Sequence, residues 1–169
     1  MTQKSLSARA WSELVLLGLI WGASFLTIRL ALDEISALSS VVHRVGWAAL
    51  ALWIVLGLRG LQVPRDLRLW ASFLVMGLLN NAIPFTLMAW GQLHIETGLT
   101  SILNAMTAIF GVLVAAAVFA DERLSVGKCT GVGLGFAGVV CVIGFGSIGG
   151  FDLRSVAQLA VLVGTVSYA

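Results

Sequence analysis

Polar side chains interrupt the third of the long apolar stretches in this chain. Asn80, Asn81 and Pro84 lie inside a hydrophobic run that extends from Leu69 to Leu93. Carboxamides inside a bilayer need hydrogen-bond partners, and polar residues there commonly mark the path of a substrate. Proline lacks an amide hydrogen and its ring crowds the carbonyl four residues earlier, so we expect a bend with a free carbonyl at Asn80. These residues predict hydrogen bonding to a polar ligand.

Helical periodicity brings further polar and small residues to the same faces. At about 100° per residue, two neighbouring spans each carry a polar arc of roughly 120°. The arc of the third span holds Gly77, Asn80, Asn81, Pro84, Met88, Gly91 and Gln92, and that of the fourth holds Thr97, Thr100, Ser101, Asn104, Thr107 and Gly111. Such residues either join helices by hydrogen bonds or line a hydrated cavity. We favour the cavity, because packing alone seldom needs so many polar groups on adjacent faces.

The first span contributes Trp21 and Ser24, within the segment Trp21-Gly22-Ala23-Ser24-Phe25. Tryptophan prefers the membrane interface, so an indole near the middle of a span is unusual. It could form a wall against which a ligand stacks, or it could pack on a glycine of its own helix. Both interpretations stay open.

Three basic side chains lie inside the spans, toward the end where Asp33 and Glu34 are found. Arg29 is four residues from Asp33 and is expected to reach the interface as an anchor. Arg44, about two turns into the second span, either clamps a carbonyl or Glu34, or attracts an anionic substrate. His43 is more simply a hydrogen-bonded packing residue than a proton carrier. We treat the three as structural or gating charges.

Composition defines the class of protein that must position these groups. The chain has 169 residues, is 59% hydrophobic and 11% charged, and has a mean hydropathy of +1.02. A soluble domain of this size would need more charged surface, and the apolar runs reach the roughly 20 residues that cross a bilayer. We predict an all-α integral membrane protein with five transmembrane helices and the start of a sixth. The spans are Trp11 to Leu32, Ser36 to Leu58, Leu69 to Leu93, Thr97 to Ala120 and Cys129 to Gly146, and the sixth begins near Ser155.

Several classes of chemistry lack a carrier in this sequence. There is no C-x-x-C, P-loop or G-x-S-x-G motif, and no cluster of residues with metal-ligand spacing. Cys129 and Cys141 fall in one predicted helix, about 18 Å apart, and so cannot form a disulfide with each other. No acidic residue lies near the middle of a span. We therefore expect neither an enzyme nor a bound metal or cofactor, and no midplane carboxylate for proton exchange.

Orientation follows from the distribution of lysine and arginine among the short loops. Cations near span ends favour the cytoplasmic side. The residues assigned to one side are Lys4, Arg9, Arg59, Arg65, Arg68, Arg123 and Lys128, against Arg154 in the loops of the other side. The N-terminus is therefore expected in the cytoplasm, in a multi-pass protein of the inner or plasma membrane. These cations are divided among short segments, so we expect no nucleic-acid partner.

Three glycines in the fifth span have a different spacing. Gly127, Gly131 and Gly135 recur at every fourth residue, which is the small-residue ridge that lets another helix approach. We expect them to serve helix packing, against the fourth helix or a second protomer.

The order of several motifs resembles one known family. These motifs are Trp21-Gly22-Ala23-Ser24-Phe25, Arg44-x-x-x-Ala48, the run from Asn80 through Gln92 to Ala105, and Asp121-Glu122-Arg123-Leu124-Ser125 before a glycine-rich helix. Together they are similar to the first half of an EamA-type transporter of the drug/metabolite transporter superfamily. The resemblance implies ten helices in two inverted five-helix repeats around a central cavity. Residues 1–146 would form the first repeat, and 147–169 a loop and the truncated start of the second, with Tyr168 placed as Trp21 is. Such relatives usually have proline where this chain has Ala108, so a kink expected there would be missing.

These observations lead to one expected function and one alternative. We predict an exporter of small metabolites or drugs, whose cavity is lined by Trp21, Ser24, Asn80, Asn81, Pro84, Gln92, Ser101 and Asn104. Because relatives have about twice as many helices, the chain is expected to be a truncated copy, either active or inactive. The alternative is a non-transporting membrane subunit or remnant that pairs with a separate second half or forms a homodimer. The expected partners are the lipid bilayer and an unidentified small substrate.

Overall fold

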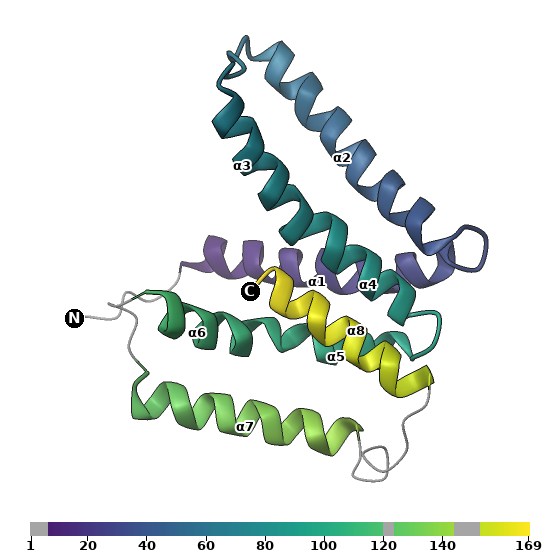
Figure 1. Ribbon diagram of the computed structural model, residues 1–169, viewed down its shortest axis with the longest axis vertical. Coiled ribbons are helices and arrows are strands. Elements are labelled where there is room, and N and C mark those ends of the chain that lie inside the picture. Colours follow the sequence, from purple (N-terminus) through teal and green to yellow (C-terminus); the bar gives the residue numbers. More distant parts are fainter. Residues whose placement is uncertain (1–6, 120–123, 144–152) are drawn as a thin grey trace.

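The structure is a computed structural model, and it describes residues 7–119, 124–143 and 153–169 (Figure 1). Within these ranges every regular element is a helix. Four helical segments there are long and apolar enough to cross a membrane. They are α1 (Ala8–Ala31), α2 (Ala37–Leu58), the continuous run of α3 (Leu67–Gly77), η1 (Leu78–Ala82) and α4 (Ile83–Gly91), and the pair α5 (Thr97–Ala105) and α6 (Thr107–Val118). Two shorter apolar helices are α7 (Val126–Ile143) and α8 (Leu153–Ser167).

The predicted all-α membrane class is confirmed by this architecture. The helices occupy the stretches that the apolar runs predicted, with ends that differ by a few residues. The fifth predicted span began at Cys129, whereas α7 begins at Val126. The predicted ends at Ala120 and Gly146 lie outside the described residues. The full number of helices and the inverted repeat stay predictions.

Side-chain caps explain where the second and third spans begin. The Ser36 hydroxyl accepts a hydrogen bond from the Ser39 amide at 3.2 Å. The Asp66 carboxylate accepts one from the Arg68 amide at 2.9 Å. The first amides of a helix have no partner within the helix, so these short polar side chains stabilise its start.

A glycine turn ends α2. Gly60 has a φ of 61°, in the left-handed region that glycine adopts without a side-chain clash. The Leu61 amide donates to the Leu56 carbonyl and the Gly60 amide to the Gly57 carbonyl, both at 3.1 Å. These two bonds form a Schellman motif, which satisfies carbonyls at the helix end and reverses the chain toward α3.

Consecutive spans run in opposite directions and meet around α4 (Figure 1). The hairpin of α2 and α3 projects away from the rest of the chain, whereas α5, α6 and α7 lie on the other side of α4. The last helix, α8, lies across α4 and α5 and makes its largest contact with α4. The meeting point of α4, α5 and α8 is therefore the centre of the fold.

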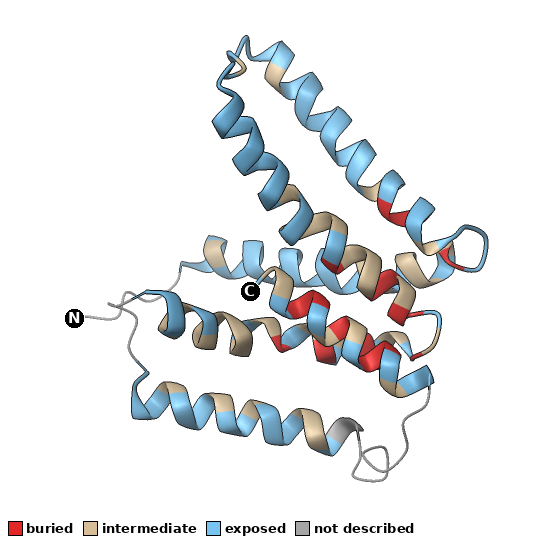
Figure 2. Cartoon of the chain, in the orientation of Figure 1, coloured by how far each residue is buried: buried red, intermediate tan, exposed pale blue. Residues whose placement is uncertain are grey.

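Buried residues are concentrated at that centre (Figure 2). One cluster contains Met88, Ile95, Leu99, Leu103, Ala157 and Val161, and a second contains Leu32, Val41 and Ala89. Most large apolar side chains of α1, α2 and α3 are exposed instead. Such surfaces are stable where lipid tails or other helices cover them, as expected for a membrane protein.

Two glycines allow α4 and α8 to approach closely. A Cβ atom added at Gly91 would lie 2.5 Å from Val161 Cγ2, which is closer than real Cβ contacts. A Cβ atom added at Gly164 would lie 3.3 Å from both the Cα and the carbonyl oxygen of Pro84. Small residues at helix crossings let backbones pack closely in membranes. This crossing fixes α8, and Tyr168 at its end, beside α4.

Candidate functional site

The third span contains a π-helical turn where the sequence places its polar cluster. In η1 (Leu78–Ala82), the Ile83 amide donates to the Leu78 carbonyl, five residues earlier. With the same five-residue spacing, the Leu79 carbonyl would accept from the amide of Pro84, but proline has no amide hydrogen to donate. The Leu79 carbonyl instead accepts a hydrogen bond from Ser167 Oγ of α8 at 2.8 Å.

A free carbonyl was expected at Asn80, which stays a prediction, and the structure shows that the neighbouring Leu79 carbonyl accepts a hydrogen bond from a side chain of α8. The expectation assumed α-helical spacing, in which Pro84 faces the carbonyl four residues earlier. The π turn adds one residue, so the carbonyl without an amide partner in that spacing is that of Leu79. The bend itself is stabilised by a contact from another helix.

The fourth span is also interrupted, at Met106 between α5 and α6. The Met106 amide donates to the Leu103 carbonyl, three residues earlier, rather than four. The Thr107 hydroxyl donates to the Asn104 carbonyl at 2.6 Å. The absence of proline at Ala108 led us to expect that a kink here would be missing, and the helical hydrogen bonding is nevertheless interrupted at Met106. A side-chain hydroxyl that bonds to the backbone can disturb a helix without proline.

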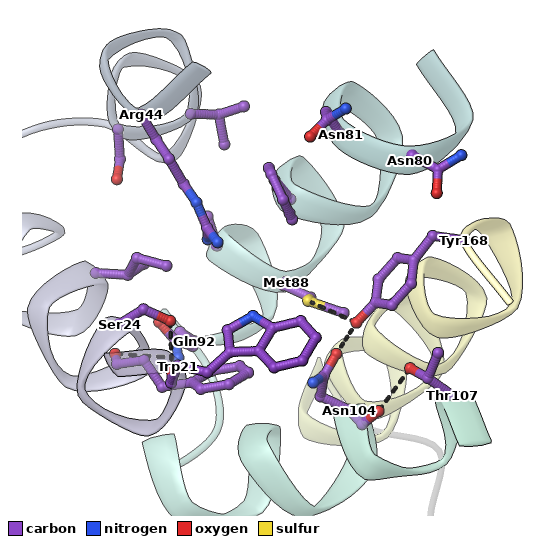
Figure 3. Close-up of a pocket in the computed structure, with 16 residues that line it drawn as sticks. Trp21, Ser24, Arg44, Asn80, Asn81, Met88, Gln92, Asn104, Thr107 and Tyr168 are labelled. Atoms are coloured by element: carbon purple, nitrogen blue, oxygen red, sulfur yellow. Dashed lines mark hydrogen bonds between the residues drawn. The ribbon is translucent and has the colours of Figure 1, made fainter. Parts of the chain in front are cut away.

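A cavity of about 470 Å³ opens beside both interruptions (Figure 3). It is lined by side chains of α1, α2, η1, α4, α5 and α6, and by the residue that follows α8. The lining residues are Trp21, Ser24, Phe25, Ile28, Ser40, Val41, Arg44, Asn80, Asn81, Phe85, Met88, Ala89, Gln92, Asn104, Thr107 and Tyr168. Carboxamides from two interrupted spans thus face one space.

Tyr168 joins the end of α8 to the interruption in the fourth span. Its hydroxyl donates to the Asn104 Oδ1 atom and lies 4.0 Å from Met88 Sδ (Figure 3). The Asn104 side chain is therefore held by a hydroxyl, while its backbone carbonyl accepts from Thr107. The analogy between the repeats placed Tyr168 as Trp21 is placed, and both side chains line the cavity.

Gln92 carries an unsatisfied acceptor at the cavity. The residue is 2% exposed, and Nε2 donates to the Phe25 carbonyl at 3.4 Å. Oε1 has no hydrogen-bond partner within the described part of the chain. Exchanging the amide oxygen and nitrogen would place two acceptors together, so the observed orientation is the favourable one. A buried acceptor without a donor is unfavourable, and a ligand with an N–H or O–H group would satisfy it.

Arg44 is the charged residue in the cavity lining. Its Cζ atom lies 4.0 Å from the centroid of the Phe85 ring, a cation–π contact. The predicted structural role was a clamp to a carbonyl or to Glu34. Among residues 7–119, 124–143 and 153–169, neither an ion pair nor a hydrogen bond of Arg44 is formed.

The structure brings six of the eight predicted cavity residues together. Trp21, Ser24, Asn80, Asn81, Gln92 and Asn104 all line the cavity. Pro84 is buried against Gly164 of α8, and Ser101 is half-buried on α5 outside the cavity lining. Pro84 therefore acts through the bend and the crossing. The role of the eight residues in substrate binding stays a prediction.

The other predicted residues are distributed more widely. The Arg29 and Asp33 side chains form the ion pair that their spacing indicated, with an N–O distance of 3.6 Å. His43 is exposed on α2, outside the cavity lining.

Within the predicted glycine ridge, only the third glycine has a close neighbour on another described helix. A Cβ atom added at Gly135 would clash with Ile109 Cδ1 of α6. At Gly131 no described atom lies within 4 Å of that position, and at Gly127 the nearest belongs to Ser125. Packing by these two glycines stays a prediction.

Sequence reasoning missed much of the apolar lining. Thr107 and Met88 lay on the predicted polar arcs, so periodicity could have included them. Phe85, Ser40 and Val41 carried no local signal, because their place in the cavity depends on how α2 packs against α4.

The site is suited to binding rather than to covalent chemistry. The described lining combines carboxamides, hydroxyls, one guanidinium and aromatic walls, without a carboxylate, cysteine or histidine. Interrupted helices whose backbone and polar side chains face a cavity are the usual substrate sites of secondary transporters. The fold and the site are those of a multi-pass helical membrane protein with a cavity of ligand size.

Comparison with known proteins identifies the family. The model of the EamA-like transporter family matches residues 11–144. The chain belongs to this family, as its motifs indicated.

Three curated relatives illustrate the similarity. A "Probable terminal-alkyne amino-acid exporter" of Streptantibioticus cattleyicolor is 34% identical over 143 residues, which cover 82% of this chain and 46% of the relative. An "Uncharacterized transporter" of Archaeoglobus fulgidus is 26% identical, over 93% of this chain and 56% of the relative. Protein PagO of Salmonella typhimurium is 30% identical, over 70% of this chain and 38% of the relative. The chain thus spans about half the length of these relatives or less. No solved structure matches it.

Proposed function

We propose that this chain contributes the substrate pocket of an exporter of small amphipathic metabolites. The observation that carries the proposal is the cavity between two interrupted spans, with Asn80 and Asn81 from one and Asn104 from the other. Its volume of about 470 Å³ is in the range of small-molecule sites. Aromatic walls would hold an apolar part of the substrate, and the carboxamides would bind its polar groups.

The name of one relative supports a substrate of amino-acid size. The name of the Streptantibioticus cattleyicolor relative describes export of terminal-alkyne amino acids. We extend the class, and not the particular substrate, to this chain. The substrate class then includes amino acids and metabolites that combine a polar end with a short apolar part.

Topology and assembly complete the proposal. We place the N-terminus in the cytoplasm and the protein in the inner or plasma membrane, because lysine and arginine are concentrated in the loops on that side. Residues 1–146 form the first repeat and 147–169 begin the second. Trp21, which is 59% exposed although it lines the cavity, supports a facing wall from further helices, in a longer chain or a partner.

Replacing Asn81 and Asn104 together by leucine is expected to reduce export by about tenfold or more, because two hydrogen-bonding groups are lost from the pocket. L-Propargylglycine, a terminal-alkyne amino acid, is a suitable probe. Cells that express the protein are loaded with it, and the alkyne that they retain is measured by azide coupling. The wild type should lower the retained alkyne, and the double variant should not.

Ser72→Leu is the matched control, because this exposed serine of α3 lies outside the cavity lining. It replaces a polar group by leucine in the same protein and should export as the wild type does. Membrane content of all variants is measured by immunoblot. Unchanged export by the well-expressed double variant would remove the carboxamides from the transport path.

A further inference from the structure

The cavity contains one charged group and one unsatisfied acceptor, and together they select a ligand. From these we infer that Arg44 binds the carboxylate of the substrate, while Gln92 Oε1 accepts a hydrogen bond from the ligand's amino group. This inference rests on the proposed function, because it names the chemical class that the same pocket takes. It adds the residue that binds each end of the ligand.

The surroundings of Arg44 favour the binding of a planar anion. The guanidinium Cζ atom lies over the Phe85 ring, 4.0 Å from its centroid, and this cation–π contact positions the group. Figure 3 shows the side chain extending from α2 toward the middle of the cavity. A guanidinium with free N–H edges can bind both oxygens of a carboxylate at once.

The protein itself supplies no competing anion in the described lining. The ion pairs of Arg9 with Glu13 and of Arg29 with Asp33 both lie outside the cavity. A cation in a mainly apolar cavity is unfavourable without a partner. A ligand carboxylate would provide that partner, whereas a ligand with a cationic end alone would be repelled.

Gln92 provides the second recognition point. Its Nε2 atom is engaged with the Phe25 carbonyl, which fixes the carboxamide. The remaining Oε1 atom is buried without a donor. An ammonium group is a strong donor to such an oxygen, so a ligand with both an ammonium and a carboxylate satisfies two groups that the protein leaves unpaired.

Binding of three small probes of equal chain length tests the inference. L-Norvaline carries both charged groups, pentanoate carries only the carboxylate, and n-pentylamine only the ammonium. Affinity is measured by calorimetry on the protein in lipid nanodiscs. The wild type should bind norvaline most tightly, pentanoate next and pentylamine least. The inference would be overturned if the wild type bound pentylamine as tightly as pentanoate, or more tightly.

Variants assign the two ends of the ligand. Arg44→Gln should weaken norvaline and pentanoate binding by about tenfold or more, without weakening pentylamine binding. Arg44→Lys keeps the charge but loses the planar group. Its affinity for norvaline and for pentanoate should therefore lie between the affinities of the wild type and of Arg44→Gln. Gln92→Leu should weaken norvaline but not pentanoate. If Arg44→Gln fails to fold, Arg44→Lys and the ranking of probes on the wild type decide the question.

The binding and export experiments fail independently. If norvaline binding depends on Arg44 but the Asn81 and Asn104 double variant still exports propargylglycine, the proposed transport path is wrong and the carboxylate site stands. If export requires the carboxamides but Arg44→Gln binds norvaline as the wild type does, the carboxylate site is wrong and the proposed function stands.

Discussion

Replacing Gly91 by alanine is expected to destabilise the protein by about 2 kcal/mol, and Val161→Ala is expected to recover much of that loss. A Cβ atom at position 91 would lie 2.5 Å from Val161 Cγ2, so one of the two helices must shift. Valine has a stiff side chain and Val161 is fully buried, which leaves it no open space to turn into. Removing its methyl groups creates the space that the new Cβ atom needs.

A double-mutant cycle measures this compensation. Free energies of unfolding for the wild type, both single variants and the double variant are obtained by SDS titration in mixed micelles, followed by circular dichroism. The double variant should be about 1 kcal/mol or more less destabilised than the sum of the singles, since the residues are in contact. Additive free energies would mean that α4 and α8 do not cross at these residues.

Gly57→Ala is the matched control for this cycle. Gly57 lies in α2, and no described atom lies within 4 Å of an added Cβ atom. Alanine is favoured over glycine inside a helix, so this variant should be as stable as the wild type or slightly more stable. A loss as large as that of Gly91→Ala would indicate a general effect of adding a methyl group.

The membrane class and the spans could be predicted from the sequence because a bilayer imposes a minimum length on apolar helices. Pro84 likewise predicted a bend in the third span. The type of bend could not be predicted, since a π turn depends on a partner for the carbonyl that it leaves without an amide. That partner is Ser167, which is far away in the sequence but lies beside Leu79 in the fold.

The candidate site shows the same division between local and tertiary information. Periodicity placed Asn81 and Asn104 on polar faces, and both line the cavity. Periodicity also placed Ser101 on a polar face, but Ser101 lies outside the cavity lining. The period identifies a helix face but not the depth at which a cavity opens on it. The interruption at Met106 was missed, since a hydroxyl bonded to the backbone replaces the proline that we expected to be necessary.

Ser167→Ala is expected to cost about 1 to 2 kcal/mol in the wild type and close to nothing when Pro84 is replaced by alanine. In the wild type, Ser167 Oγ donates to the Leu79 carbonyl at 2.8 Å, and Pro84 has no amide hydrogen that could replace it. Removing the hydroxyl therefore leaves the carbonyl without a donor in a medium poor in water. Alanine at position 84 restores an amide hydrogen within the same helix.

The Pro84→Ala variant should also lose export, because the bend and the pocket depend on each other. Once residue 84 can donate, α-helical bonding to the Asn80 carbonyl competes with the π turn. Closing the turn would rotate Asn80 and Asn81 by about 100° relative to α4, which takes their carboxamides away from the cavity. We expect export of propargylglycine to fall by about tenfold, with stability measured by the same titration as above. Full export by Pro84→Ala, together with an unchanged cost of Ser167→Ala in that background, would show that the π turn forms without proline.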